Sequence, residues 1–188
     1  MLSIINAPQD VLSQTAKPVE KIDASVKVII KGMESALINS TDPEGVGLAA
    51  PQVGKSLQIF MIKASPDAKL QVFINPLLTI PEVVTPKGEK TKKKKGKKSK
   101  GVTLEGCLSL KDIWGVVHRF PKVHLSWLDE NGDKHEKDFS GFMATIIQHE
   151  YDHLQGILFP KRVLEQKNQL YKSIKDENDE TIFEELNI

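Results

Sequence analysis

The sequence contains a single cysteine, Cys107, so no disulfide bond can form within the chain. It has no uninterrupted apolar run of roughly 18 residues, which argues against a membrane-spanning helix and against a membrane partner. The opening MLSIINAPQD has no basic cluster and no long apolar stretch, so a secretory signal peptide is not expected. These absences favour a reducing compartment, in which the one thiol remains available for metal binding or chemistry.

The composition is that of an ordinary folded protein, with 39% hydrophobic and 27% charged residues among 188. Such values exclude a disordered or collagen-like chain. Because a domain typically contains about 100–200 residues, we expect a single domain. We place it at residues 1–175, followed by an acidic tail at residues 176–188 that contains six acids and no base.

The net charge of +1 conceals a strongly basic segment from Lys87 to Lys100. This segment contains nine lysines and one glutamate, so its local charge is +8 and the remaining residues carry −7. It has no apolar residue to bury and it repels itself, which favours a solvated loop inserted into the domain. Contact with RNA or the ribosome, or a nuclear signal, is the alternative interpretation of such a run.

Helical spacing of apolar residues is clearest near the N-terminus. Asp23 can cap a helix in which Val26, Ile30, Met33 and Leu37 recur on one face. This helix is expected to end near residues 40–43.

Two further helices are expected in the last third of the chain. Ser140 is a suitable cap for a helix that runs to about Leu154, and Gly156 suits the left-handed exit from it. Pro160 blocks its continuation. A final polar helix is expected over residues 163–174.

Between the helices, short runs of β-branched and aromatic residues predict strands, and the dipeptide Asn131-Gly132 predicts a type I′ hairpin turn. The expected strands begin at Leu57, Leu70, Leu77, Trp114, Lys122 and Asp133. Strands in the middle of the chain with helices toward both ends indicate an α+β domain. We expect short, mostly antiparallel sheets around the helix at 140–154, with one helix near each terminus.

The segment QHEYDHLQG predicts a metal site on this central helix. His149 and His153 are four residues apart, so both imidazoles leave one face, roughly 6 Å apart along the axis. Glu150 is displaced around the helix but lies within reach of a water bound to the same ion. Two solvated histidines on a surface helix are the alternative, but the flanking apolar residues indicate burial, and buried histidines need partners.

A catalytic metal site needs a third protein ligand and an open fourth position. Cys107, in the segment EGCLS, is a better third ligand than the remaining histidines, which are His118, His124 and His135. We expect His124 and His135 to be surface or satisfied residues, and an inert buried thiol is the alternative for Cys107. One thiolate with two imidazoles favours a soft or borderline ion such as zinc or iron(II).

A third motif, EGVGLAAPQVG, is rich in small residues that permit close approach of the backbone to a ligand. Its amide, Gln52, can donate to a developing oxyanion. A tight packing turn explains this segment equally well when it is considered alone.

Together and in this order, GVGLAAPQ, EGCLS and HEYDH resemble the three motifs of the peptide deformylase family. The resemblance extends to KPVEKID, FINP and HLQGILF and covers roughly residues 3–172. It implies a hydrolase that removes the formyl group from N-formylmethionine at the start of nascent polypeptides and releases formate.

The resemblance also implies a role for each site residue. Cys107, His149 and His153 would hold one divalent ion, iron(II) in the usual form, although zinc, nickel or cobalt can occupy such sites. Water would be the fourth ligand, and Glu150 would take its proton and pass it to the leaving amine. The amide of Gln52 and the backbone N–H of Leu108 would then stabilise the developing oxyanion.

Residues around the ion are implied as well. Asp152 would orient a ligand or the helix, and Glu105 and Arg119 would form a supporting pair. The methionine side chain would occupy an apolar pocket, and Gly47 would offer backbone hydrogen bonds to the substrate. By position, the pocket would involve Val46, Phe142, Thr145 and Ile146, each of which is equally compatible with plain core.

Three positions depart from the family pattern. Lys111 replaces a common proline, Trp114 replaces an arginine often found in the loop that faces the substrate, and His118 replaces the proline before Arg119. None of these departures touches the metal or its base. They affect the expected grip on the peptide rather than the reaction.

Two other functions compete with deformylation. An HExxH peptidase would use the same base, but such enzymes usually take their third ligand downstream, whereas Cys107 lies upstream. A non-catalytic protein that binds RNA or the ribosome through Lys87–Lys100 would have no need of Glu150. For the deformylase we expect a bacterial cytoplasmic location and consider a ribosome contact through the lysine-rich loop or the C-terminal helix.

Overall fold

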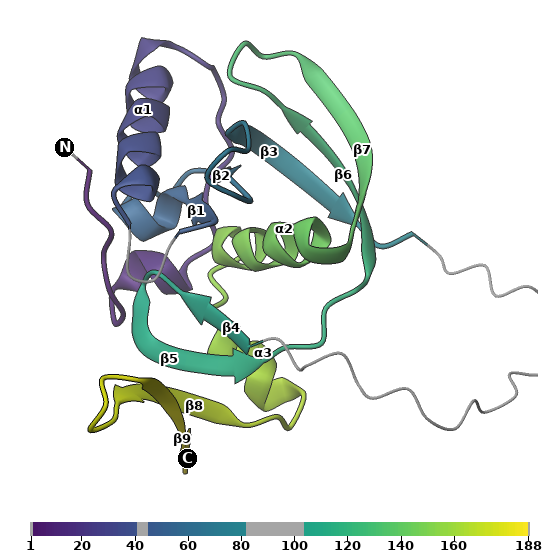
Figure 1. Ribbon diagram of the computed structural model, residues 1–188. Coiled ribbons are helices and arrows are strands. Elements are labelled where there is room, and N and C mark those ends of the chain that lie inside the picture. The colour runs from purple at the N-terminus through teal and green to yellow at the C-terminus, as the bar shows by residue number, and fades with distance from the viewer. Residues whose placement is uncertain (1, 41–44, 82–103, 188) are drawn as a thin grey trace, which may run out of the picture.

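The computed structural model describes residues 2–40, 45–81 and 104–187 (Figure 1). The lysine-rich segment Lys87–Lys100 lies outside the described residues. Within the described chain no helix is long and apolar enough to cross a membrane.

Most strands of the described chain lie between its first and second α-helices, and two more follow the third. The helices are α1 (Ala24–Ile38), α2 (Gly141–Leu154) and α3 (Phe159–Glu165), with short 3-10 helices η1 (Asp10–Ser13) and η2 (Ala50–Val53). The strands are β1 (Gly47–Ala49), β2 (Ile59–Ile62), β3 (Gln71–Thr79), β4 (Leu104–Cys107), β5 (Leu110–Val116), β6 (Lys122–Leu128), β7 (Lys134–Ser140), β8 (Leu170–Lys175) and β9 (Thr181–Leu186).

The strands form two separate antiparallel sheets. One has five strands in the order β1-β2-β3-β6-β7, and the other has four in the order β4-β5-β8-β9. Helix α2 lies between them, with the five-stranded sheet curving around one side and β4 and β5 on the other (Figure 1). This arrangement confirms the predicted α+β class with a central helix.

Helix α1 forms as its sequence predicts. The Asp23 side chain accepts hydrogen bonds from the backbone N–H groups of Ser25 and Val26, which satisfies two donors that have no partner within the helix. The four apolar residues of the predicted face, Val26, Ile30, Met33 and Leu37, are all buried. The helix ends at Ile38, slightly earlier than expected.

Helix α2 also lies where predicted, although its ends differ in detail. Ser140 occupies the N-cap position, but its side chain makes no capping hydrogen bond. Gly156 adopts the expected left-handed conformation, with φ of 67°, and a Cβ there would lie 2.6 Å from the backbone of Ser13. Pro160 does more than end α2, because it stands in the first turn of α3.

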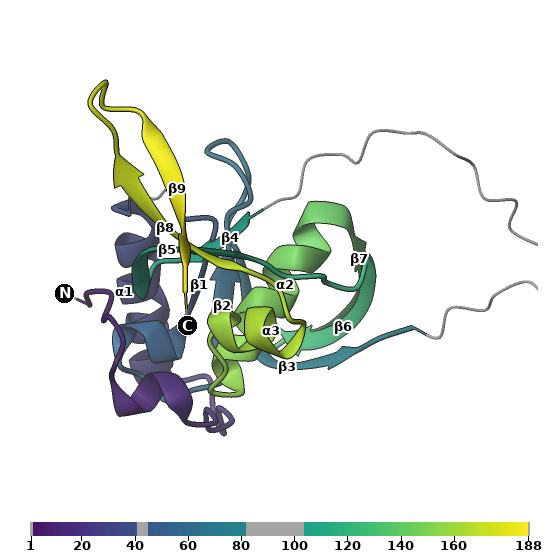
Figure 2. The same cartoon turned by 90° about the horizontal axis from the view of Figure 1, so that it is seen from below.

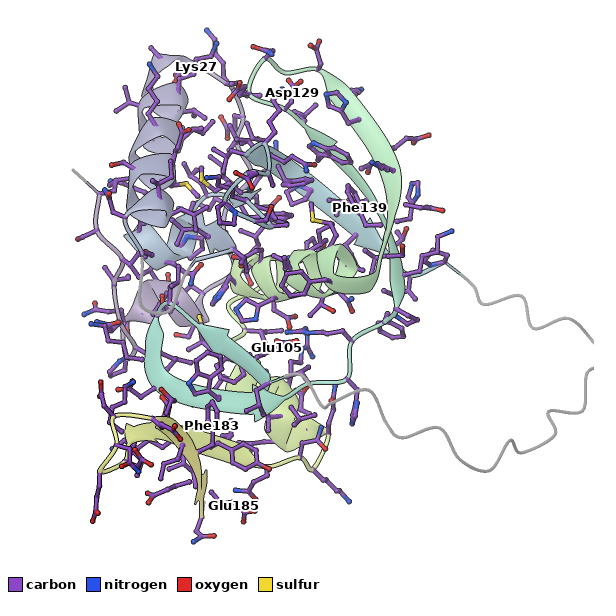
Figure 3. The ribbon with its side chains drawn as sticks, in the orientation of Figure 1. Lys27, Glu105, Asp129, Phe139, Phe183 and Glu185 are labelled. Carbon is purple, nitrogen blue, oxygen red and sulfur yellow. The ribbon has the colours of Figure 1, made fainter. Side chains whose placement is uncertain are left out.

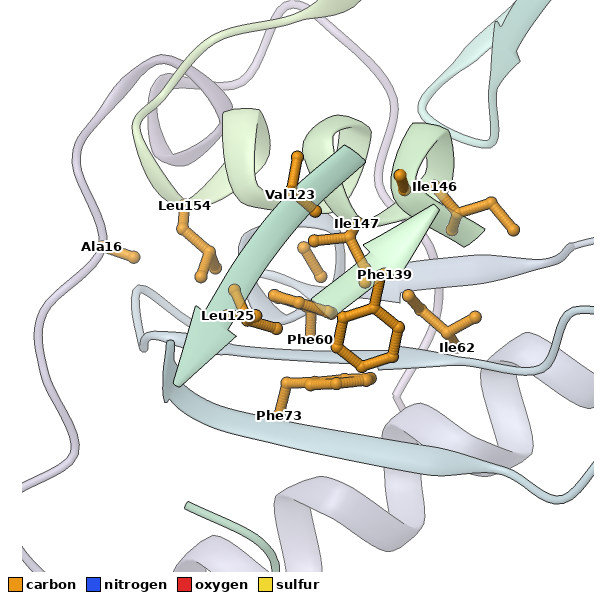
Figure 4. Packing of buried hydrophobic residues seen from close by; sticks show 12 residues of the cluster. Ala16, Phe60, Ile62, Phe73, Val123, Leu125, Phe139, Ile146, Ile147 and Leu154 are labelled. Carbon is orange, nitrogen blue, oxygen red and sulfur yellow. The ribbon is translucent and has the colours of Figure 1, made fainter. Parts of the chain in front are cut away.

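The main core lies where α2 packs on the five-stranded sheet (Figure 4). Phe73 is fully buried at its centre, and its ring stacks on Phe60 with the centroids 4.6 Å apart. Phe139 meets Phe73 edge-on at 6.2 Å, and Ile146 and Ile147 of α2 complete the cluster. This packing fixes the position of the helix that carries the two metal-site histidines.

The predicted polar helix over residues 163–174 is wrong beyond α3. Lys167 has a φ of 57°, which ends the helix, and the chain then pairs as β8 with β5. The acidic tail returns as β9, so residues 170–186 form a hairpin that completes the four-stranded sheet beside β5 (Figure 2). Pairing with a strand distant in sequence overrides a weak local helical tendency.

Smaller differences concern the strands. The runs from Leu70 and Leu77 form one continuous strand, β3, with an irregular register between Ile74 and Leu77. The prediction of a type I′ turn at Asn131-Gly132 is wrong. Only Gly132 has a positive φ, and the loop is longer than two residues because it joins Leu128 to Lys134. Strands β1 and β4 were not expected, since both lie in segments rich in small residues.

We expect Phe73→Ala to lower the free energy of unfolding by about 3–5 kcal/mol, because it removes a ring from a filled core. Phe120→Ala is the matched control, since that side chain is 55% exposed, and it should cost much less. Urea unfolding followed by circular dichroism measures both. Equal losses for the two variants would show that Phe73 is not part of a tightly packed core.

Candidate metal centre

The three predicted metal ligands converge in the structure. Cys107 ends β4, and His149 and His153 leave one face of α2. One donor atom from each residue lies within 4.8 Å of the other two. The Cys107 Sγ is 3.3 Å from the His153 Nε2, and both residues are buried.

Local structure explains how Cys107 reaches the helix. The four-residue spacing on α2 places the imidazoles side by side, with ring centroids 5.0 Å apart. On β4, Gly106 pairs with Trp114 but Cys107 pairs with Leu110, so the register shifts between Gly106 and Cys107. An irregularity of this kind turns a side chain away from the regular alternation of a strand.

The donor set fits a divalent ion. In a tetrahedral site with ordinary bond lengths, sulfur and nitrogen ligands lie about 3.6 Å apart, close to the separation of Cys107 and His153. The His149 Nδ1 contacts the Glu105 carboxylate at 3.1 Å, which leaves Nε2 for the ion in the arrangement common to metal-binding histidines. Among the described residues, Glu150 Oε2 is one of two buried side-chain atoms with no hydrogen-bond partner.

The pKa values of the two imidazoles are shifted in opposite directions. Burial lowers the pKa of His153 well below its ordinary value, so this ring is neutral, as a metal ligand must be. Burial acts in the same direction on His149, but contacts with Cys107 and Glu105 outweigh it and raise the pKa of that ring well above its ordinary value.

A chain of alternating charges links the centre to α3. Arg119 donates to both oxygens of Glu105 at 2.9 Å and to Asp152 at 2.6 Å. Arg162 of α3 donates to the other Asp152 oxygen at 2.7 Å. Glu105 lies on β4 below α2 (Figure 3), and its carboxylate also meets His149 of that helix.

The structure therefore brings together the predicted pair Glu105 and Arg119, and Asp152 joins it. Although burial acts to raise it, the pKa of Glu105 is lowered, because His149 and Arg119 hydrogen-bond to its carboxylate. Sequence reasoning missed Arg162. The only signal for it was an isolated arginine six residues after Gly156.

Gln52 and Glu150 face the same centre. The Gln52 Oε1 accepts from the backbone N–H of Ala49 at 2.8 Å, and its Nε2 lies 3.4 Å from both the Cys107 Sγ and the Ser109 Oγ. Burial raises the pKa of Glu150 to about 7. A polar amide and a carboxyl of near-neutral pKa thus lie next to the three donors.

Gly47 packs directly against this carboxyl. A Cβ at Gly47 would lie 2.3 Å from the Glu150 Oε1, so only glycine leaves room for the side chain. The motif GVGLAAPQ is therefore more than a packing turn, because it makes space for Glu150 and carries Gln52.

A cavity of about 220 Å³ opens beside the centre. All the residues predicted for the substrate pocket line it, as do Gln52 and Leu108; the pocket residues are Val46, Gly47, Phe142, Thr145 and Ile146. Gly45, Leu104, Gly106 and Trp114 also line it. Trp114 was noted in the sequence as a departure from a family pattern, and Gly45 and Gly106 as glycines that allow close approach of the backbone. Leu104 was not noted.

The other histidines lie elsewhere. His135 is exposed and His124 is half-buried at the surface, and they contact Asp129 at 2.9 Å and Asp138 at 2.7 Å, respectively. His118 is also exposed. The expectation that His124 and His135 are satisfied surface residues is confirmed.

Comparison with known proteins agrees with this geometry. The family model described as polypeptide deformylase matches residues 1–170. The peptide deformylase of Christiangramia forsetii is 33% identical over 183 residues, which cover 92% of this chain and 87% of that protein. The peptide deformylase of Pseudothermotoga lettingae is 38% identical over 149 residues, which cover 79% of this chain and 75% of that protein.

Solved structures give the same result. The crystal structure of the peptide deformylase from Thermotoga maritima matches with a TM-score of 0.69 at 31% identity, covering 86% of this chain and 97% of that one. The peptide deformylase from Synechococcus elongatus, solved in complex with actinonin, matches with a TM-score of 0.67 at 34% identity. The match covers 86% of this chain and 78% of that one.

Replacing Arg119 should destabilise the protein strongly. Arg119→Met leaves the buried Glu105 carboxylate without its cationic partner, and we expect a loss of about 3–5 kcal/mol in the free energy of unfolding. Lys122→Met is the control, because its ion pair with Asp138 is half exposed and screened by solvent, so its loss should change stability little. Similar urea midpoints for the two variants would contradict a structural role for the buried pair.

Replacing the sulfur ligand should weaken metal binding. We expect Cys107→Ser to lower metal affinity by about tenfold or more, because a serine hydroxyl is a harder and less acidic donor. Bound metal per folded chain, measured by elemental analysis after dialysis, tests this. His124→Ala removes a surface histidine and should leave the metal content unchanged; an unaltered content in Cys107→Ser would remove Cys107 from the ligand set.

Proposed function

The chain belongs to the peptide deformylase family, and we propose that it hydrolyses the formyl group of N-terminal formylmethionine on nascent polypeptides and releases formate. The observation that carries this proposal is the convergence of one thiol and two imidazoles beside a carboxyl and an amide in one cavity. Such a set could hold a metal ion and supplies a base and an oxyanion donor, the groups that metal-dependent hydrolysis of an amide uses.

We propose that Cys107, His149 and His153 hold one divalent ion. When bound, such an ion acts as a Lewis acid that lowers the pKa of a coordinated water and polarises a carbonyl. The mixed sulfur and nitrogen donors support iron(II) as the native ion and are also compatible with zinc, nickel or cobalt.

Glu150 is the proposed base. Its Oε2 has no hydrogen-bond partner among the described residues, and burial raises its pKa to about 7, so it can take up and release a proton near neutral pH. In this role it accepts a proton from the attacking water and passes it to the amine that leaves. The contact with Gly47 holds the carboxyl in place while it does so.

Gln52 and the backbone N–H of Leu108 are the proposed donors to the oxyanion. The bond from the Ala49 N–H to the Gln52 Oε1 fixes the side-chain amide, so its NH₂ group faces Cys107. A donor held in position before the reaction stabilises negative charge without reorganisation, and the loss of one such donor typically costs about 3 kcal/mol in the transition state.

The methionine side chain is proposed to occupy the apolar part of the cavity. Ile146 is buried, Val46 and Thr145 lie beside it, and Phe142 is 56% exposed at the rim. Gly47, in β1, is proposed to offer backbone hydrogen bonds to the substrate. A flexible, unbranched thioether suits such an irregular space.

We also propose a bacterial cytoplasmic location and a contact with the ribosome through the lysine-rich segment Lys87–Lys100. The support is the charge of that segment, which matches a phosphate backbone, and the formylated start of its proposed substrates. The alternative route, through a C-terminal helix, loses support because α3 is short and β8 and β9 follow it.

Formate release from formyl-Met peptides, with enzyme prepared without oxygen, tests the function directly. Deformylation yields formate and an intact peptide with a free amino terminus. A peptidase would instead cleave the same peptide, formylated or not, at an internal bond. Mass spectrometry of the products distinguishes the two, and internal cleavage without formate would overturn the proposal.

Glu150→Gln should retain the ion but lose turnover. The amide has the shape of the carboxyl but cannot accept the proton, so we expect kcat to fall by about 10²–10⁴-fold while the metal content stays constant. Glu165→Gln, on an exposed part of α3, is the control and should keep normal kcat. Activity of Glu150→Gln within a few fold of the parent enzyme would exclude Glu150 as the base.

A further inference from the structure

An indole ring forms one wall of the cavity. Trp114 lies on β5, opposite Gly106 of β4, and lines the same cavity as Cys107 and Glu150. A Cβ at Gly106 would lie 2.8 Å from the Trp114 Cζ3, so the ring rests directly on the backbone of β4. Because Gly106 has no side chain, there is room for the indole next to the proposed metal ligand Cys107.

The C-terminal hairpin holds this ring from the other side. The Trp114 Nε1 donates to the Ser173 Oγ of β8 at 3.1 Å. The ring of Phe183, on β9 (Figure 3), meets the indole edge-on with the centroids 5.8 Å apart. Ser173 and Phe183 are cross-strand partners, so one hairpin position supplies both contacts. Trp114 is therefore fixed in orientation rather than free to rotate.

The cavity wall around the indole is apolar. Leu104 and Leu108, which flank the segment Glu105–Cys107, line the same cavity as Trp114, whereas the Glu105 carboxyl meets the imidazole of His149. Among the described residues that line the cavity there is no lysine or arginine. Along the described part of this wall, a peptide that leaves the metal centre therefore meets hydrophobic surface rather than a lysine or arginine side chain.

We propose that Trp114 is a specificity-determining residue that receives an apolar side chain of the substrate downstream of the formylated methionine. The β8–β9 hairpin positions it through Ser173 and Phe183, which gives the acidic C-terminal segment a role in substrate choice. This inference rests on the proposed deformylase function. Because successive side chains of an extended peptide point to opposite sides, only one of the two positions after methionine contacts the indole.

The test uses formylated tetrapeptides that carry either Leu or Asn, side chains of similar size, at the second or the third position. For the parent enzyme we expect kcat/KM to favour Leu by about five- to tenfold at one of these positions and to be nearly indifferent at the other. Trp114→Ala should bring the preferred ratio to within about twofold of one, mainly through KM. Melting temperature and metal content verify that the variant is folded and loaded.

Phe183→Ala and Ser173→Ala test the positioning role without removing the indole. We expect each to reduce the Leu/Asn ratio at the same position by about two- to threefold. Ile182→Ala is the matched control, because Ile182 is a neighbour on β9 with similar exposure, 41% against 44%, but points to the other face. It should leave the ratio unchanged. These surface variants keep the test decisive if Trp114→Ala does not fold.

Each outcome has a distinct meaning. Formate release with no Leu preference at either position, or a preference that survives both Trp114→Ala and Phe183→Ala, overturns the role of Trp114 and leaves deformylation intact. An equal change in Ile182→Ala overturns the specific role of the Phe183 contact. No formate from any peptide, with the metal bound, contradicts the proposed function itself.

Discussion

The contact between β4 and α2 is the constraint on which the rest of the structure depends. It places the Cys107 Sγ 3.3 Å from the His153 Nε2 and joins Glu105 of the same strand to His149 of the helix. Sheets on both sides of α2 bury these polar groups, so each needs a partner in place of water. Arginines satisfy the carboxylates, and a cation suits the remaining donors. The same burial brings the pKa of Glu150 to about 7.

Much of this arrangement could be predicted from the sequence, because it depends on local rules. The Asp23 cap and the helical spacing after it predicted α1, and the four-residue spacing of His149 and His153 placed two ligands on one face of α2. Three ordered motifs indicated Cys107 as the third ligand, and its position in the structure agrees. Spacing within one helix, unlike pairing between strands, is visible in a short stretch of chain.

What was missed depends on contacts between distant segments. The polar residues after α3 have no strong periodicity. They form strands because β8 pairs with β5, with Trp114 opposite Tyr171. Arg162 could not be recognised from the sequence because its role depends on the hydrogen bond to Asp152, ten residues away across the turn at Gly156. Trp114 stood out in the sequence only as a difference from a family pattern. Its contacts with Ser173 and Phe183 become evident once β8 and β9 are in place.

The central claim is that one cation joins the Cys107 sulfur to both imidazoles of α2. Anomalous diffraction, with crystals of the metal-loaded protein measured on both sides of the absorption edge of the bound metal, tests it most directly. The account predicts a single strong peak about 2.3 Å from the Cys107 Sγ and about 2.1 Å from one nitrogen each of His149 and His153. A loaded protein whose peak lies away from Cys107, or contacts only one of the two histidines, would contradict it.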